Sequence, residues 1–243
     1  ITRLVGQVMF PALSRVRGNL SDLRRVFLRA VKYTALVSIP LSVAIFVFTP
    51  PFMDILYGLK WKNAIVPMQL LVIYGLMRSI AGNMGEVFKA GGKPQWLLGI
   101  AAWRLATMAI CLYPVTVRFG IVGVSALSAI VAVVDFIISA ALVNRIARTS
   151  FADFARILAP LFGLSIAAVI VARIVFGLTY DVYPPLALLI AGATMVVVYA
   201  LLVLRLDGEV RNRMIGLMSE VAVGVRLLDL VGVAPRRADA MDD

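Results

Sequence analysis

The sequence predicts an all-α integral membrane protein, a polytopic bundle of about six transmembrane helices. Of its 243 residues, 62% are hydrophobic and only 15% are charged, whereas soluble domains are roughly half apolar. The apolar residues gather in runs of about 20 or more, the length of helix that crosses the hydrocarbon core. These runs do not alternate between apolar and polar residues, as the strands of a membrane barrel do.

The predicted spans are separated by short polar connections. They cover residues 33–53, 64–88, 95–117, 119–143, 157–177 and 184–204. Residues 1–16 are predicted to be the end of a truncated transmembrane helix, and residues 17–32 a cytoplasmic amphipathic linker. Residues 205–243 are predicted to form a cytoplasmic amphipathic helix and a disordered tail. Alternatively, each amphipathic stretch extends the neighbouring span instead of lying in the membrane interface.

Helix signals mark the first elements of the chain. Ser21 is a favourable N-cap residue, and Asp22 suits the positive end of the helix dipole. Pro40 is expected to kink the first span because it removes a backbone N–H. Pro94 begins the third span after the tight turn AGGKPQ at 90–95. This turn is not a phosphate-binding loop, because the GxxxxGK[ST] spacing is absent.

The basic residues predict the orientation of the bundle. Lightly charged loops, with Lys60, Lys62 and Arg118, alternate with more basic segments. By the positive-inside rule the basic segments are cytoplasmic, which places both ends of the chain in the cytoplasm. The basic residues of the predicted cytoplasmic segments are Arg3, Arg15, Arg17, Arg24, Arg25, Arg29, Lys32, Lys89, Lys93, Arg145, Arg148, Arg156, Arg205, Arg211, Arg213, Arg226, Arg236 and Arg237.

Composition excludes several classes of function. The net charge of +11 is spread over short connections, whereas a nucleic-acid-binding protein gathers its basic residues on one soluble face. The chain has no histidine and a single cysteine, Cys111. It therefore cannot build a Ser-His-Asp triad, a Cys-His pair or a histidine metal site by itself. We expect no catalytic residue, no metal, no cofactor and no nucleic-acid partner, and therefore a protein that is not an enzyme.

Five polar residues inside the predicted spans are the candidate substrate-binding residues. Ionisable groups in a bilayer usually face a cavity or a charged partner. An arginine there can bind a lipid-linked phosphate or an acidic sugar in bidentate fashion, or it can form an internal ion pair. Such pairs would join Arg104 to Asp135, or Arg78 to Glu86. Asn83 has two corresponding alternatives, a sugar hydroxyl and a neighbouring helix. The candidates are Arg78, Asn83, Glu86, Arg104 and Asp135.

Aromatic residues cluster near the ends of the predicted spans. Such positions are typical of the belt of aromatic side chains at the membrane interface. The residues are Tyr57, Trp61, Trp96, Phe119, Tyr180 and Tyr183.

Three segments resemble one family of transporters. They are VMFPALSRVRGNLSDLRRVFLRAVKYTALVSIPLSVAIFVFTPPFMDILYGLKW at 8–61, AIVPMQLLVIYGLMRSIAGNMGEVFKAGGKPQW at 64–96 and FGIVGVSALSAIV at 119–131. Their order and spacing are similar to those of Wzx-like polysaccharide flippases, which export O-antigen and exopolysaccharide units. This family belongs to the multidrug/oligosaccharidyl-lipid/polysaccharide exporter superfamily. The likeness runs over about 8–148 and includes Arg78.

The resemblance implies the C-terminal portion of a two-lobed, MATE-like transporter with a central cavity. Such a protein flips an undecaprenyl-diphosphate-linked oligosaccharide from the cytoplasmic to the outer leaflet of the bacterial cytoplasmic membrane. The implied partners are this lipid-linked oligosaccharide, membrane lipids, and the machinery of polysaccharide polymerisation and export. Cationic residues of the cavity would hold the diphosphate or an anionic glycan.

Three alternatives remain at this point. A drug/cation antiporter of the same superfamily would need acidic residues for its cargo or its coupling ion. A membrane glycosyltransferase or polymerase would need clustered carboxylates or a long outer catalytic loop, and the predicted outer loops are short. A non-catalytic accessory bundle is the third alternative.

Overall fold

The computed structural model of the chain describes residues 20–181, 183–206 and 208. Within these residues there is no strand, and five helices are long and apolar enough to cross a membrane. This confirms the predicted all-α, multi-pass membrane fold. The predicted helix end at 1–16 and the amphipathic helix after Gly208 lie outside the described residues. The elements are α2 (Leu20–Leu56), the 3₁₀ helix η1 (Leu59–Ala64), α3 (Ile65–Ala90), α4 (Gln95–Ala147), α5 (Phe151–Thr179) and α6 (Pro184–Leu206).

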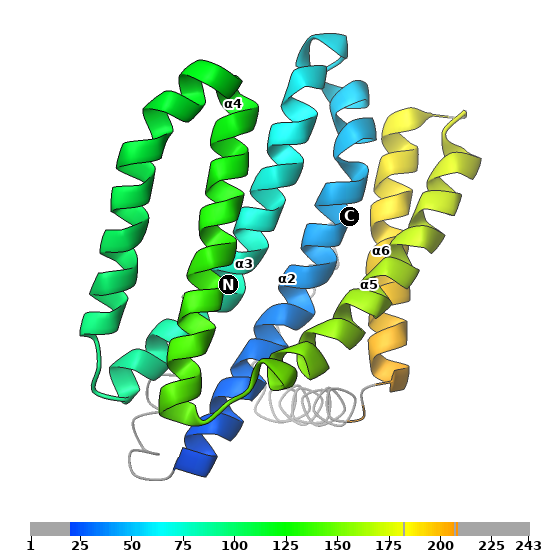
Figure 1. The fold of residues 1–243 in the computed structure, drawn as a ribbon. Helices are drawn as coiled ribbons and strands as arrows, with labels where there is room; N and C mark the ends of the chain where they lie inside the picture. The colour runs from blue at the N-terminus through cyan, green and yellow to red at the C-terminus, as the bar shows by residue number, and fades with distance from the viewer. Residues whose placement is uncertain (1–19, 182, 207, 209–243) are drawn as a thin grey trace, which may run out of the picture. The chain divides into compact units, whose positions relative to one another are not determined.

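The described helices up to Tyr199 form one unit, and the end of α6 from Ala200 belongs to a second. Within the first unit the chain reverses alternately at two ends (Figure 1). One end, here called the η1 end, holds η1, the bend of α4 and the start of α6. The opposite end, here called the Asp153 end, holds the turn at 91–94 and the start of α5. This alternation is what consecutive membrane crossings require.

Helix α4 accounts for the difference between five helices and six predicted spans. It contains the third and fourth predicted spans as two arms that run side by side in opposite directions (Figure 1). They meet at Gly120, whose φ of 57° and ψ of −148° are non-helical. A side chain at this position would be strained, whereas glycine adopts positive φ readily. The reversal was predicted two residues earlier, at Arg118, between spans ending at Val117 and starting at Phe119.

Helix α2 joins the predicted amphipathic linker to the first predicted span in one continuous helix of 37 residues. Of the two alternatives for the linker, the structure has the one in which it extends the neighbouring span. The helix also passes through Pro40, Pro50 and Pro51. Each proline removes the N–H that would bond the carbonyl four residues earlier, so α2 needs substitute donors inside the membrane.

Two side chains supply such donors. The carbonyl of Leu36, four residues before Pro40, accepts a hydrogen bond of 2.9 Å from the Tyr199 hydroxyl. The carbonyl of Phe46, four residues before Pro50, accepts one of 2.9 Å from Gln69 Nε2. Neighbouring helices therefore stabilise α2 at two of the three carbonyls that its prolines leave free.

The largest apolar core lies towards the Asp153 end, where α2, α3, α4 and α5 pack together. Phe154 of α5 makes edge-to-face ring contacts with Phe27 of α2 at 5.9 Å and with Phe136 of α4 at 6.0 Å between centroids. Such pairs add stability beyond the burial of apolar area. The buried members of this core are Leu23, Phe27, Val31, Ala35, Ile39, Leu76, Ile80, Met84, Val87, Phe88, Ala140, Val143, Ala147, Phe154 and Leu161.

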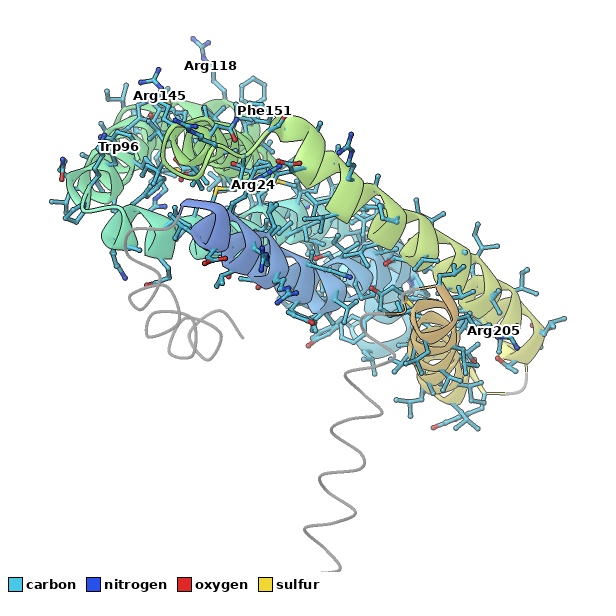
Figure 2. The ribbon with its side chains drawn as sticks, turned by 90° about the horizontal axis from the view of Figure 1, so that it is seen from below. Arg24, Trp96, Arg118, Arg145, Phe151 and Arg205 are labelled. Carbon is cyan, nitrogen blue, oxygen red and sulfur yellow. The ribbon has the colours of Figure 1, made fainter. Side chains whose placement is uncertain are left out.

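The start of α5 ties this end of the bundle together. Ser150 and Asp153 form a capping box, in which the Ala152 amide donates to Ser150 Oγ and the Ser150 amide donates to Asp153 Oδ2. Both bonds satisfy amides that a helix start leaves without partners. Arg24 of α2 adds an ion pair with Asp153, with Nη2 and Oδ2 2.7 Å apart. Figure 2 views the bundle from this end, with Arg24 beside the start of α5.

Candidate functional site

The two arms of α4 bring together two of the predicted site residues. Arg104 of the first arm and Asp135 of the second form an ion pair, with Nη1 and Oδ2 3.2 Å apart. The Asp135 side chain is 2% exposed and the Arg104 side chain is 29% exposed. A carboxylate this deeply buried requires a cationic partner, and the α4 hairpin supplies it.

Arg78 lies near the middle of α3 and is exposed. Leu71, Gly75 and Gly82 are also exposed, at spacings of three and four residues that place them on one face of α3 with Arg78. A guanidinium at membrane depth is costly against lipid, so this face is suited to a polar cavity or to a polar partner. We call it the Arg78 face.

The electrostatic balance around these residues is positive. Asp135 interacts electrostatically with both Arg104 and Arg78, so the three side chains carry one net positive charge. Only Arg104 forms an ion pair with Asp135 within the described part of the chain. The second carboxylate oxygen of Asp135, Oδ1, is buried and has no hydrogen-bond partner among the described residues. Arg78 has no ion-pair partner among the described residues, and its side chain is exposed on α3.

The other two candidate residues lie elsewhere. Asn83 is buried between α2 and α3, where its Nδ2 donates to Thr34 Oγ1 at 3.0 Å. Glu86 pairs with Lys89 one turn later, with Oε1 and Nζ 3.0 Å apart. The structure therefore groups Arg78, Arg104 and Asp135, and it does not bring Asn83 or Glu86 to that group. The possible pair of Arg78 with Glu86 is not formed.

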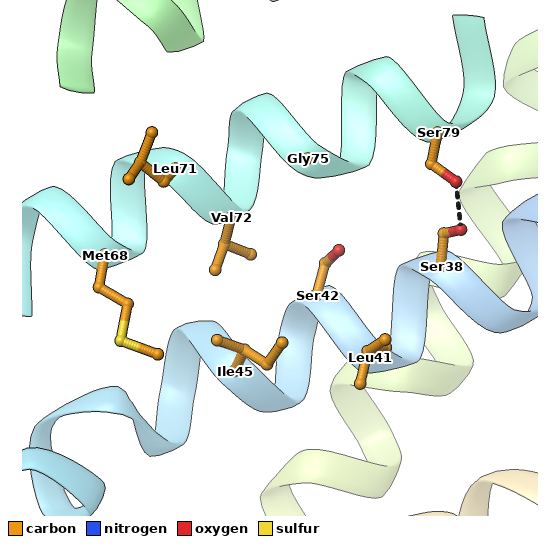
Figure 3. A pocket seen from close by; sticks show the side chains of 9 residues that line it. All are labelled: Ser38, Leu41, Ser42, Ile45, Met68, Leu71, Val72, Gly75 and Ser79. Atoms are coloured by element: carbon orange, nitrogen blue, oxygen red, sulfur yellow. Dashed lines mark hydrogen bonds between the residues drawn. The ribbon is translucent and has the colours of Figure 1, made fainter. Parts of the chain in front are cut away.

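An apolar groove of about 440 Å³ runs between α2 and α3 beside the Arg78 face (Figure 3). Ser38 and Ser79 close one end of it, with their hydroxyl oxygens 2.6 Å apart. Met68 and Ile45 line the opposite end, towards η1 (Figure 3). The remaining lining residues are Leu41, Ser42, Leu71, Val72 and Gly75. The groove thus combines an apolar trough with a polar end next in sequence to Arg78.

The sequence carried signals for some contacts that were not predicted. The spacing of Ser150 and Asp153 is the capping-box pattern, and it could have indicated the start of α5 at Phe151. The prolines of α2 could have indicated that the carbonyls of Leu36 and Phe46 need donors. Nothing local identifies the donors, because Tyr199 lies 163 residues from Leu36. Among the described residues, no group of three potential metal ligands occurs.

The fold and these residues define a multi-pass membrane protein with an arginine exposed at membrane depth and a buried ion pair beside it. The sequence model of a family described as polysaccharide biosynthesis proteins matches residues 1–66. No solved structure matches the chain.

Three curated bacterial proteins are similar to the chain. An uncharacterized membrane protein in the cps region of Klebsiella pneumoniae is 26% identical over 123 residues, which cover 51% of this chain and 25% of that protein. The lipopolysaccharide biosynthesis protein WzxC of Escherichia coli is 26% identical over 87 residues, covering 36% and 18%. The teichuronic acid biosynthesis protein TuaB of Bacillus subtilis is 28% identical over 138 residues, covering 57% and 29%.

These matches confirm the predicted resemblance to Wzx-like polysaccharide flippases. The chain spans less than a third of the length of each of these relatives. The names of the relatives concern polysaccharide biosynthesis and membranes, and none states a catalytic activity, in agreement with the prediction of a protein that is not an enzyme.

Proposed function

We propose that the protein containing this chain is a polysaccharide-synthesis transporter of the bacterial cytoplasmic membrane. Its cargo is an undecaprenyl-diphosphate-linked oligosaccharide, which it moves from the cytoplasmic to the outer leaflet. The observation that carries the proposal is the exposure of Arg78 near the middle of a membrane helix. A cation at this depth is suited to an anionic headgroup in transit.

The physical problem of such transport explains why an exposed arginine is useful. A glycan headgroup cannot cross hydrocarbon unaided, because each polar group left without a partner costs several kcal/mol. A diphosphate adds charge that must also be neutralised. The guanidinium of Arg78 can hold phosphate oxygens with two parallel hydrogen bonds, while Asp135 keeps the charge of Arg104 balanced.

The groove between α2 and α3 supports a lipid as the carrier of the headgroup. Its trough is lined mainly by apolar side chains, and its polar end is formed by Ser38 and by Ser79, the residue after Arg78. An isoprenoid chain in the trough would leave its diphosphate near that polar end. The groove and the arginine thus match the two halves of an amphiphilic cargo.

The prolines of α2 support movement between inward-open and outward-open states. Transporters of this kind commonly use interrupted helices around the substrate site. The carbonyls of Leu36 and Phe46 are held by side chains of other helices, so they can exchange partners without breaking a helical hydrogen bond. We propose that α2 bends at Pro40 and Pro50 when the cavity changes its side.

The proposed orientation has the Asp153 end in the cytoplasm, and with it both ends of the chain. This end carries most of the basic residues of the described helices, as the positive-inside rule expects of a cytoplasmic surface. The proposed partners there are anionic lipids and the polymerisation and export machinery. The basic residues at this end are Arg24, Arg25, Arg29, Lys32, Lys89, Lys93, Arg145, Arg148 and Arg156.

The pairing of the two acidic site candidates makes a drug/cation antiporter the less favoured alternative. Such a protein needs a carboxylate that is free to meet a cationic cargo. Asp135 is paired with Arg104 and Glu86 is paired with Lys89, whereas Arg78 is exposed.

The experiment that tests the proposal replaces Arg78 in the intact protein. In a strain that lacks the gene, export of surface polysaccharide is measured after complementation with wild type, Arg78→Gln or Arg78→Lys. We expect Arg78→Gln to abolish export at normal protein levels and Arg78→Lys to retain part of it. Full export by Arg78→Gln at equal expression would contradict the proposal.

A further inference from the structure

Backbone hydrogen bonds hold the connection between α2 and α3 in one shape. The amides of Tyr57 and Gly58 both donate to the Met53 carbonyl, at 3.0 and 2.9 Å. The Trp61 amide donates to the Gly58 carbonyl at 3.2 Å. Gly58 has a φ of 74°, which glycine adopts without strain. The connection therefore presents its side chains in a preorganised arrangement.

A chain of aromatic rings extends from α2 into this connection. Phe52 and Tyr57 have their ring centroids 6.0 Å apart, and Tyr57 and Trp61 have theirs 5.9 Å apart in edge-to-face geometry. Tyr57 and Trp61 are each 55% exposed. Their contact fixes the orientation of both rings and leaves aromatic surface open to a ligand.

Lys60 and Lys62 flank Trp61, and both are exposed. Within the part of the chain that the structure describes, neither lysine forms an ion pair or lies over an aromatic ring. The two ammonium groups therefore remain available to an anion beside the exposed rings. We call Tyr57, Lys60, Trp61 and Lys62 the η1 patch.

We propose that the η1 patch binds acidic sugar units of the oligosaccharide at the outer face of the membrane. The apolar C–H faces of a sugar ring can pack on the indole and phenol rings, whose faces carry partial negative charge. A carboxylate on the sugar can accept charge-assisted hydrogen bonds from the lysines. This inference rests on the proposed function and orientation, and it adds a site for the glycan that is separate from the Arg78 face.

A comparison with Trp96 distinguishes the η1 patch from an ordinary interfacial anchor. At the Asp153 end, Lys93 lies over the Trp96 ring at 4.6 Å from its centroid. Trp96 also packs against Phe88 at 5.9 Å. There the tryptophan and the lysine satisfy each other, whereas Trp61 and its two lysines do not.

The test uses a water-soluble probe, so that it does not depend on transport. The intact protein is placed in nanodiscs of zwitterionic lipid, and binding of a galacturonic acid hexamer is measured by calorimetry, with neutral maltohexaose as the comparison probe. The variants are Trp61→Ala and the double variant Lys60→Gln/Lys62→Gln. The matched controls are Trp96→Phe and Lys93→Gln, which alter the tryptophan and lysine of the opposite end.

We expect wild type to bind the acidic hexamer at least about tenfold more tightly than maltohexaose, a free-energy difference of about 1.4 kcal/mol. Both η1 variants should lose this binding, and both controls should keep it. Absence of binding to wild type, or binding that persists in Trp61→Ala, would overturn the inference. The inference would also be overturned if the η1 variants bound the acidic hexamer as wild type does and changed only the association of the protein with vesicles of anionic lipid. Failure of the proposed function would appear separately, as export that survives Arg78→Gln.

Discussion

The exposed face of α3 and the hairpin of α4 each hold an arginine at membrane depth, and they treat it differently. In the hairpin, Arg104 is paired with the buried Asp135 at 3.2 Å. On α3, Arg78 is exposed with no ion pair among the described residues. From this difference we propose two roles: Arg104 neutralises a buried carboxylate and joins two arms of a helix, whereas Arg78 meets the anionic cargo.

The comparison is tested most strongly by the same substitution at both arginines. Arg78→Gln should lower polysaccharide export by about 100-fold, the effect of losing a charge-assisted contact of about 3 kcal/mol in a desolvated site. Its folding should be unchanged, because Arg78 is exposed. Arg104→Gln should lower thermal stability, and each folded molecule of this variant should export more polysaccharide than a folded molecule of Arg78→Gln. Export and detergent-extracted protein are measured together, and equal export per folded molecule in both variants would break the comparison.

The contribution of the Arg104–Asp135 ion pair to stability can be measured by removing Asp135. Asp135→Asn should destabilise the protein by about 2 kcal/mol, below the value for a fully buried pair because Arg104 is 29% exposed. The double variant Arg104→Gln/Asp135→Asn should recover part of this loss, since neither charge is then left alone. Thermal unfolding in detergent measures the cycle. Strictly additive losses would argue against the ion pair.

The hairpin that joins Arg104 to Asp135 depends on Gly120. Gly120→Ala should destabilise the protein by about 1.5 kcal/mol, because the φ of 57° is unfavourable for a residue with a side chain. Gly99→Ala, in the helical first arm of α4 with open space at its Cβ position, serves as the control and should be neutral or stabilising. Equal stability of the two variants would contradict the role of Gly120.

The smallest effects are expected from substitutions that remove the hydrogen-bond donors to the Leu36 and Phe46 carbonyls of α2. Tyr199→Phe and Gln69→Leu each remove a donor to α2, and each should cost about 1 kcal/mol, the typical worth of one hydrogen bond. Thermal unfolding in detergent measures both. Pro40→Ala restores an N–H for the Leu36 carbonyl, so Tyr199→Phe should be nearly harmless in that background. An unchanged loss there would mean that Tyr199 acts through packing instead.

Local signals in the sequence placed some helix bounds closely, whereas contacts between distant residues were left open or were not predicted. The predicted spans at 64–88 and 184–204 lie within α3 and α6 to within one or two residues, because apolar length and turn residues are local signals. The reversal at Gly120 was placed two residues early, since the charge of Arg118 was the stronger local sign of a loop. The continuity of α2 was left open between two alternatives.

The candidate site shows the same division between local and distant information. The cost of burying an ionisable group selected Arg78, Glu86, Arg104 and Asp135 from the sequence alone, and the structure groups three of them without Glu86. Whether Asp135 meets an arginine depends on the α4 hairpin. For Arg104, the sequence left open both an ion pair with Asp135 and a site for an anionic substrate. The engagement of Asn83 with Thr34, 49 residues away, depends on how α2 packs on α3, which periodicity does not determine.

The central claim is that Arg78, and not Arg104, meets the anionic headgroup of the cargo. Native mass spectrometry of the intact protein in detergent can measure its preference for undecaprenyl diphosphate over the neutral undecaprenol. Wild type and Arg104→Gln should both prefer the diphosphate by about tenfold or more, equivalent to about 1.4 kcal/mol, and Arg78→Gln should bind the two lipids equally. A preference that survives Arg78→Gln, or that disappears equally in Arg104→Gln, would contradict the account.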